Sequence, residues 1–129
     1  MIDDKTLPTP RPEDRQVIQS YGPGRFRISN VVYEHAVLVL PGRTLRWQLD
    51  EAGAITLASL APLRENGTRL EILLVGCGAR AVAVPEGVRL WLREAGIVAD
   101  AMDSGAACRT YGVLLAEGRS VAAALMPMG

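Results

Sequence analysis

The chain is poor in the residues on which metal, redox and nucleic-acid sites most often depend. Its 129 residues include two cysteines, Cys77 and Cys108, one histidine and one lysine. Structural zinc sites usually need four cysteine or histidine ligands in set spacings, so we expect no metal site. Nucleic-acid binding relies on clustered Lys and Arg. Fourteen basic residues balance fourteen acidic ones, which argues against a nucleic-acid partner.

Long apolar runs and aromatic residues are also scarce. Aromatic residues make up 5% of the chain, so the core must be built mainly from Leu, Val, Ile and Ala. No apolar run approaches the roughly 20 residues that a membrane-spanning helix needs. The first 16 residues carry four acids and three prolines, unlike a secretory signal or an Arg-rich transit peptide. Two thiols without a disulfide pattern are typical of a reducing compartment. We therefore predict a soluble, cytoplasmic protein without a transmembrane segment.

Length and composition indicate one domain with a polar extension. A chain of 129 residues, 49% of them hydrophobic, can bury a single ordinary core. Residues 1–16 are rich in proline and polar residues and have no hydrophobic periodicity, so we interpret them as a flexible N-terminal tail. Residues 17–129 are then the single α/β domain.

The first part of the domain is predicted to consist of short antiparallel strands. Residues 25–28 read Arg-Phe-Arg-Ile, the alternation of a strand with one face toward water. Two more strands are expected in the apolar run 36–40, which Pro41-Gly42 ends, and in the alternating stretch 45–49. Strands at such close spacing favour an antiparallel meander.

In the second part, helices alternate with strands. The expected elements are a short helix over 55–66 interrupted by Pro62, a buried strand over 70–75, a short extended piece over 79–84, a helix over 85–96, a strand over 97–102, a helix from 104 to about 117 and a strand over 121–126. The helix at 85–96 has the clearest signal, since Val88, Trp91, Leu92 and Ala95 form one stripe. Alternating strands and helices indicate right-handed crossovers and parallel pairing.

Cys108 has two interpretations. It shares one side of its predicted helix with Tyr111, and free cysteine is among the most buried residue types, so we predict a core residue. The alternative is a reactive thiol in the second helical turn, activated by the helix dipole and Arg109. Consecutive helical residues point about 100° apart, so Arg109 should face elsewhere. Cys77 would have to lie within about 7 Å of Cys108, Cα to Cα, for a redox pair.

Two further segments could form a site or simply shape the backbone. Asp103 and Ser104 are expected to cap the helix that follows, and the alternative is that they line a pocket for a polar ligand. Gly76-Cys77-Gly78 follows a buried strand, as dinucleotide-binding loops do, but it lacks the third glycine and a following helix. We interpret it as a tight strand exit.

The remaining candidates are His35, Leu90 and Val113. His35 is predicted to be a solvated surface residue, because a metal site needs several ligands. Leu90 and Val113 are expected to be exposed and to contribute to a contact surface, although single apolar surface residues are common.

Three stretches resemble one known family. They are IQSYGPGRFRISNVVYEHAVLVLP, the Gly-Cys-Gly after LEILLV, and above all MDSGAACRTYGVLLAEGRSVAAALMP. Over residues 18 to 126 the chain is similar to the small-domain family that includes mitochondrial complex I assembly factor 3, an adipogenesis-associated cytoplasmic protein and many uncharacterised bacterial proteins. The chain departs from the family pattern at Cys77 and Ser104, where Thr is usual, and at Gly112, where Asn is usual.

The resemblance implies a three-layer α/β fold with a mixed sheet, no established enzymatic activity and no cofactor. For the mitochondrial member of the family it also implies a role in assembling respiratory complex I through protein contacts. We therefore expect a non-catalytic interaction or assembly protein with protein partners, and unprotected sheet edges favour a homodimer. The alternative is a small-ligand-binding protein or thiol-dependent enzyme whose pocket is formed by Gly76, Cys77, Gly78, Asp103, Ser104, Cys108 and Tyr111.

Overall fold

The computed structural model describes residues 15–51, 53–65 and 69–129. The elements, in chain order, are β1 (Ile18–Gly22), β2 (Arg25–Ile28), β3 (Val31–Tyr33), β4 (Val37–Leu40), β5 (Arg43–Arg46), the 3₁₀ turn η3 (Ala58–Leu60), α1 (Ala61–Arg64), β6 (Ile72–Cys77), α2 (Glu86–Glu94), β7 (Val98–Met102), α3 (Ser104–Ala116) and β8 (Val121–Met126). Most of the tail predicted for residues 1–16 lies outside the described residues. Arg15 and Gln16 are described, and both contact the domain: Arg15 donates to the Leu115 carbonyl and Tyr111 donates to the Gln16 carbonyl.

A five-stranded mixed sheet forms the centre of the molecule, with the strand order β5-β4-β8-β6-β7. Strands β8, β6 and β7 run parallel, whereas β4 pairs antiparallel with both β5 and β8. β8 is the middle strand, and the first five of its six residues are buried, so other elements cover both of its faces. The predicted combination of antiparallel strands and parallel crossovers is therefore confirmed.

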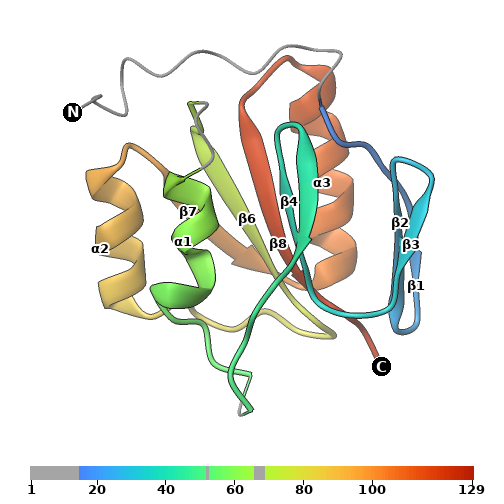
Figure 1. Cartoon of the computed structure of the whole chain (residues 1–129), viewed down its shortest axis with the longest axis horizontal. Coiled ribbons are helices and arrows are strands. Elements are labelled where there is room, and N and C mark those ends of the chain that lie inside the picture. Colours follow the sequence, from blue (N-terminus) through green and yellow to red (C-terminus); the bar gives the residue numbers. More distant parts are fainter. Residues whose placement is uncertain (1–14, 52, 66–68) are drawn as a thin grey trace.

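Three layers follow from the two faces of this sheet (Figure 1). Side chains alternate along each strand, so neighbouring residues pack into two separate cores. Leu73, Val75 and Ala122 pack on the side of α1 and α2, whereas Leu74 and Ala123 pack on the opposite side, under α3. The three-layer α/β fold expected from the resemblance is confirmed.

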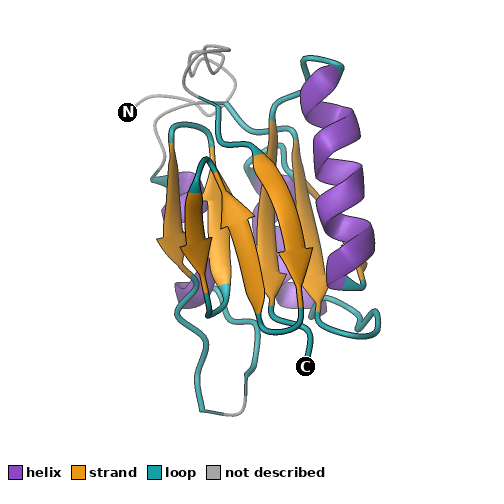
Figure 2. Cartoon of the chain, turned by 90° about the vertical axis from the view of Figure 1, so that its right-hand side faces the viewer, coloured by secondary structure: helices purple, strands orange, loops and turns teal. Residues whose placement is uncertain are grey.

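A second sheet of three strands, β1-β2-β3, shares the α3 side of the molecule. Its strands pair antiparallel, with Phe26 opposite both Tyr21 and Tyr33. Phe26 and Ile28 are fully buried and join the core under α3, while Arg25 and Arg27 face outward, as the alternation predicted. Figure 2 is turned so that this small sheet, at the right of Figure 1, faces the viewer. The chain therefore presents a complete sheet face to solvent here.

Three predicted elements differ in the structure. The strand expected at 45–49 lies earlier in the chain, as β5 at Arg43–Arg46, where it pairs with β4. Residues 79–84 form a loop and no strand, because they pair with no strand among the described residues. Pro62 does not interrupt a helix: it lies in the first turn of α1, where the missing N–H costs nothing, and η3 precedes it. The helices predicted at 85–96 and 104–117 and the strands at 97–102 and 121–126 are confirmed, with ends that differ by two residues at most. Gly96 and Gly118 follow the two helices with positive φ angles.

Candidate functional site

The Gly-Cys-Gly segment lies where β6 ends against the first turn of α3. Gly76 is buried there, and a methyl group on its Cα would come within 2.9 Å of Leu125 Cδ2 and 3.0 Å of Ser104 Cα. Contacts this short do not occur between real side chains, so only glycine lets the helix approach the strand this closely. Gly78 has a φ of +83°, in the left-handed region that favours glycine. The segment is therefore a tight strand exit, as interpreted from the sequence.

Ser104 connects three chain segments at this junction. Its backbone N–H donates to the Gly78 carbonyl at 2.8 Å, and its hydroxyl accepts from the Gly78 N–H at 2.8 Å. The same hydroxyl donates to the Met126 carbonyl at 2.5 Å. The side chain is fully buried, so these bonds satisfy polar groups that water cannot reach. Ser104 thus joins the ends of β6 and β8 to α3, and it is not the helix cap that the sequence indicated.

Asp103 alone caps α3. Its carboxylate accepts from the Ala106 N–H at 2.8 Å, three residues along, and its backbone is extended. This geometry satisfies one of the free N–H groups of the first turn and places a negative charge at the positive end of the helix dipole. The carboxylate that was considered for a ligand pocket is therefore engaged in the helix cap.

Cys108 and Tyr111 face the core under α3. Cys108 is 5% exposed and packs among side chains of β4, β6 and β8. Burial raises the pKa of its thiol to about 12, and the positive charge of Arg109 lowers it only in part. Burial also raises the pKa of Tyr111, whose hydroxyl donates to the Gln16 carbonyl at 2.6 Å. At neutral pH the Cys108 thiol is protonated and enclosed, as expected of a core residue.

Cys77 lies on the other face of the sheet. It packs with the core beneath α1 and α2, and its sulfur contacts the Val82 carbonyl at 3.5 Å. Because Cys77 and Cys108 belong to cores that the sheet separates, the two thiols do not face each other. Cys77 borders an apolar hollow of about 300 Å³, which also includes Ile55, Val82 and Met126.

The seven residues of the predicted pocket are thus divided between different environments. Gly76, Gly78, Asp103 and Ser104 meet at the β6–α3 junction through backbone packing and hydrogen bonds. The hollow beside Cys77 includes none of the other six residues. The two hollows that Tyr111 lines include none of the remaining members of the set. Within the described ranges, no cluster of three or more His, Cys, Asp or Glu side chains is placed to hold a metal ion.

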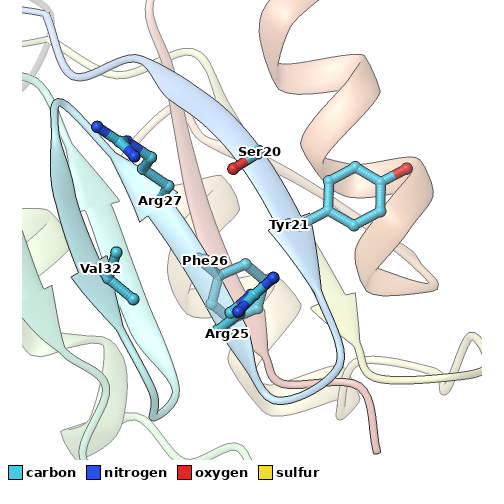
Figure 3. Close-up of a pocket in the computed structure, with 6 residues that line it drawn as sticks. All are labelled: Ser20, Tyr21, Arg25, Phe26, Arg27 and Val32. Atoms are coloured by element: carbon cyan, nitrogen blue, oxygen red, sulfur yellow. The ribbon is translucent and has the colours of Figure 1, made fainter.

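A polar surface that the sequence analysis did not select lies on the small sheet. A hollow of about 240 Å³ opens on its outer face, and six residues line it: Ser20, Tyr21, Arg25, Phe26, Arg27 and Val32 (Figure 3). The alternation in residues 25–28 placed both arginines on the wet face of a strand. That pattern was the available signal, but it could not show that β1 and β3 complete a hollow around them.

Comparison with known proteins gives matches across almost the whole described domain. A family model described as "Protein of unknown function (DUF498/DUF598)" matches residues 18–126. An uncharacterized protein of Rhodobacter capsulatus is 38% identical over 112 residues, which are 86% of this chain and 84% of that protein. NADH dehydrogenase (ubiquinone) 1 alpha subcomplex assembly factor 3 of Xenopus tropicalis is 31% identical over 110 residues, 85% of this chain. The matched region spans only 60% of that assembly factor.

The structural comparison agrees with the sequence comparison. The crystal structure of a protein described as an outer membrane protein of Bartonella henselae superimposes with a TM-score of 0.81. The two chains are 32% identical, and the match covers 95% of this chain and 99% of that one. In the part of this chain that the structure describes, no helix is long and apolar enough to cross a membrane. By sequence and by fold, the chain belongs to the DUF498/DUF598 family, whose members include the NADH dehydrogenase assembly factors that the resemblance indicated.

Proposed function

We propose that this chain is a non-catalytic interaction domain that assists the assembly of a multisubunit respiratory complex. The observation that carries the proposal is the similarity to the assembly factors, which extends over 85% of the chain and is not confined to one motif. A likeness of this extent includes both sheets and α3. Since the assembly factors are longer than the matched region, the proposal concerns only the function of this shared domain.

The positions of the candidate residues support a structural use of the domain. Cys108 is enclosed in the core, Ser104 joins three segments, and Gly76 allows close packing. Each of these residues has a role in stability that accounts for its chemical type. Exposed apolar side chains, by contrast, are distributed over the surface, with Leu90 on α2 and Val113 on α3 as predicted. Such side chains are available for protein contacts.

Cross-linking in native extract tests the proposal. The labelled chain is expected to form a specific cross-link to one or a few proteins, and an excess of unlabelled chain should abolish it. A strain that lacks the protein is expected to accumulate less assembled respiratory NADH dehydrogenase on a native gel, and re-expression should restore it. The absence of both effects would contradict an assembly role.

The alternative, a small-ligand or thiol-dependent activity, has one supporting observation. The half-buried Cys77 borders an apolar hollow of about 300 Å³, at the lower limit of the usual range for small-molecule pockets. Thermal unfolding of the chain in the presence of metabolites tests this alternative. A metabolite that raises the melting temperature, and that no longer does so once a maleimide has modified Cys77, would favour it.

A further inference from the structure

The outer face of the small sheet combines two positive charges with an apolar side chain. Cross-strand pairing places Arg27 between Ser20 of β1 and Val32 of β3, so these three side chains form one row on the same face. Arg25 is two residues away on β2 and points to the same side, with its guanidinium over Gly22. We call these four residues, Ser20, Arg25, Arg27 and Val32, the arginine face. Figure 3 shows both arginines on the strand that also carries Phe26, with the Phe26 ring behind Arg25.

Neither guanidinium of the arginine face is neutralised within the described residues. Arg25 and Arg27 take part in no ion pair and no hydrogen bond there, unlike Arg119 and Arg109. Arg119 pairs with Glu71 at 3.0 Å, and Arg109 donates to the Tyr21 hydroxyl at 2.5 Å. Residues 15–46 contain five arginines and a single acidic residue, Glu34. The small sheet itself, residues 18–33, contains Arg25, Arg27 and no acidic residue, although the chain as a whole has no net charge.

The chemistry and size of the hollow indicate what it can accept. Guanidinium groups bind carboxylates through paired N–H donors, and an exposed apolar neighbour adds a non-polar contact. The hollow, at about 240 Å³, is smaller than the roughly 300 Å³ at which small-molecule pockets begin, so it suits side chains better than a separate ligand. Two carboxylates at alternate positions of an extended peptide lie about 7 Å apart, the same repeat that separates Arg25 from Arg27 along β2.

We propose that the arginine face binds an extended acidic segment of a partner protein, with its carboxylates on Arg25 and Arg27 and an apolar side chain on Val32. This inference rests on the proposed function, because it assigns the contact surface of an interaction domain. Val32 is 53% exposed, so binding of the segment would remove a large part of its apolar surface from water, which favours the bound state.

Fluorescence anisotropy with a labelled peptide of four Glu-Val repeats tests this site. The native chain is expected to bind the peptide at low salt and to bind the matching Gln-Val peptide much less. The double variant Arg25→Gln/Arg27→Gln should weaken binding about tenfold or more, since it removes two charge-assisted contacts. The matched control is Arg89→Gln/Arg93→Gln on the exposed side of α2, which removes the same charge and should change affinity less than about twofold.

Three outcomes would overturn the proposal. They are failure of the Glu-Val peptide to bind better than the Gln-Val peptide, equal weakening by both double variants, and displacement of the peptide by millimolar inorganic phosphate. The last result would indicate a free-phosphate site. If Arg25→Gln/Arg27→Gln failed to fold, Arg25→Lys/Arg27→Lys would replace it: this variant keeps the charge, loses the paired donors and should give an intermediate affinity.

The same variants separate this inference from the proposed function. If cross-linking recovers a partner equally well with the native chain and with Arg25→Gln/Arg27→Gln, the assembly proposal stands. The inference that the arginine face binds the partner is then wrong. If neither chain recovers a partner and the strain that lacks the protein assembles respiratory NADH dehydrogenase normally, the assembly proposal fails, whatever the peptide result.

Discussion

Gly76 lies where β6 passes closest to the first turn of α3, and the contact leaves no room for a side chain. We expect Gly76→Ala to lower the free energy of unfolding by about 1–3 kcal/mol, the usual cost of forcing extra volume into a packed interior. The new methyl group would meet Leu125 at 2.9 Å and the backbone of Ser104 at 3.0 Å, so β6, β8 or α3 must move. Urea unfolding at neutral pH measures the change.

The same substitution at Gly112 provides the control. Gly112 is in the middle of α3, and nothing lies within 4 Å of the position that a methyl group would occupy. Gly112→Ala should therefore raise the free energy of unfolding by up to about 1 kcal/mol through helix propensity. An unchanged stability of Gly76→Ala would refute the close-packing explanation of the Gly-Cys-Gly segment.

The burial of Cys108 could be predicted from residue type and helical position, whereas the location of Cys77 could not. Its burial follows from the apolar character of free cysteine and from its position on the same side of α3 as Tyr111. The location of Cys77 could not be predicted in this way, because a cysteine at the end of a strand faces one side or the other according to register. The structure places it on the face opposite to Cys108.

At the scale of elements, α3 depends on its first turn. Asp103→Ala is expected to lower the free energy of unfolding by about 1 kcal/mol, because the Ala106 N–H loses its acceptor and the helix dipole loses a nearby negative charge. Asp103→Asn keeps an oxygen acceptor and should retain most of the stability. Thermal unfolding followed by circular dichroism would measure both variants, and equal losses would attribute the effect to charge and not to the hydrogen bond.

Elements with strong periodicity were predicted well, and those without it were not. The apolar stripe of α2 and the length of α3 are local patterns, so the sequence was sufficient to identify both helices. Residues 79–84 have the composition of a strand, but a strand exists only where another strand accepts its hydrogen bonds. Pro62 was misread for a similar reason, since its effect depends on whether it begins a helix or lies within one.

For the whole molecule, unfolding exposes the Cys108 thiol to water, which links stability to pH. The folded thiol has a pKa raised by burial from its ordinary value of 9.0 to about 12. Above pH 9 the unfolded chain therefore releases this proton while the folded chain retains it. The contribution of Cys108 to the free energy of unfolding is therefore complete below pH 9. It falls by about 1.4 kcal/mol per pH unit as the pH rises from 9 toward 12.

Urea unfolding at a series of alkaline pH values checks this expectation. Cys108→Ala is less stable at neutral pH because it leaves a small cavity, but its stability should fall less steeply just above pH 9. At higher pH both proteins should lose stability together, since Tyr111 is also buried with a raised pKa. Parallel curves for the two proteins throughout this range would show that Cys108 is not the group responsible.

Three statements remain predictions: the division into a tail at residues 1–16 and a domain at 17–129, the cytoplasmic location, and the homodimer.

The sequence by itself determined the class of fold, the two long helices, the wet and dry faces of β2 and the burial of Cys108. These properties depend on residue type and on repeats of two or 3.6 residues, which are local. Only the tertiary structure decided that Ser104 joins β6 and β8 to α3, that the sheet separates the two thiols, and that Arg25 and Arg27 border a hollow with Ser20 and Val32. Such arrangements depend on strand order and register between distant segments, which no local pattern specifies.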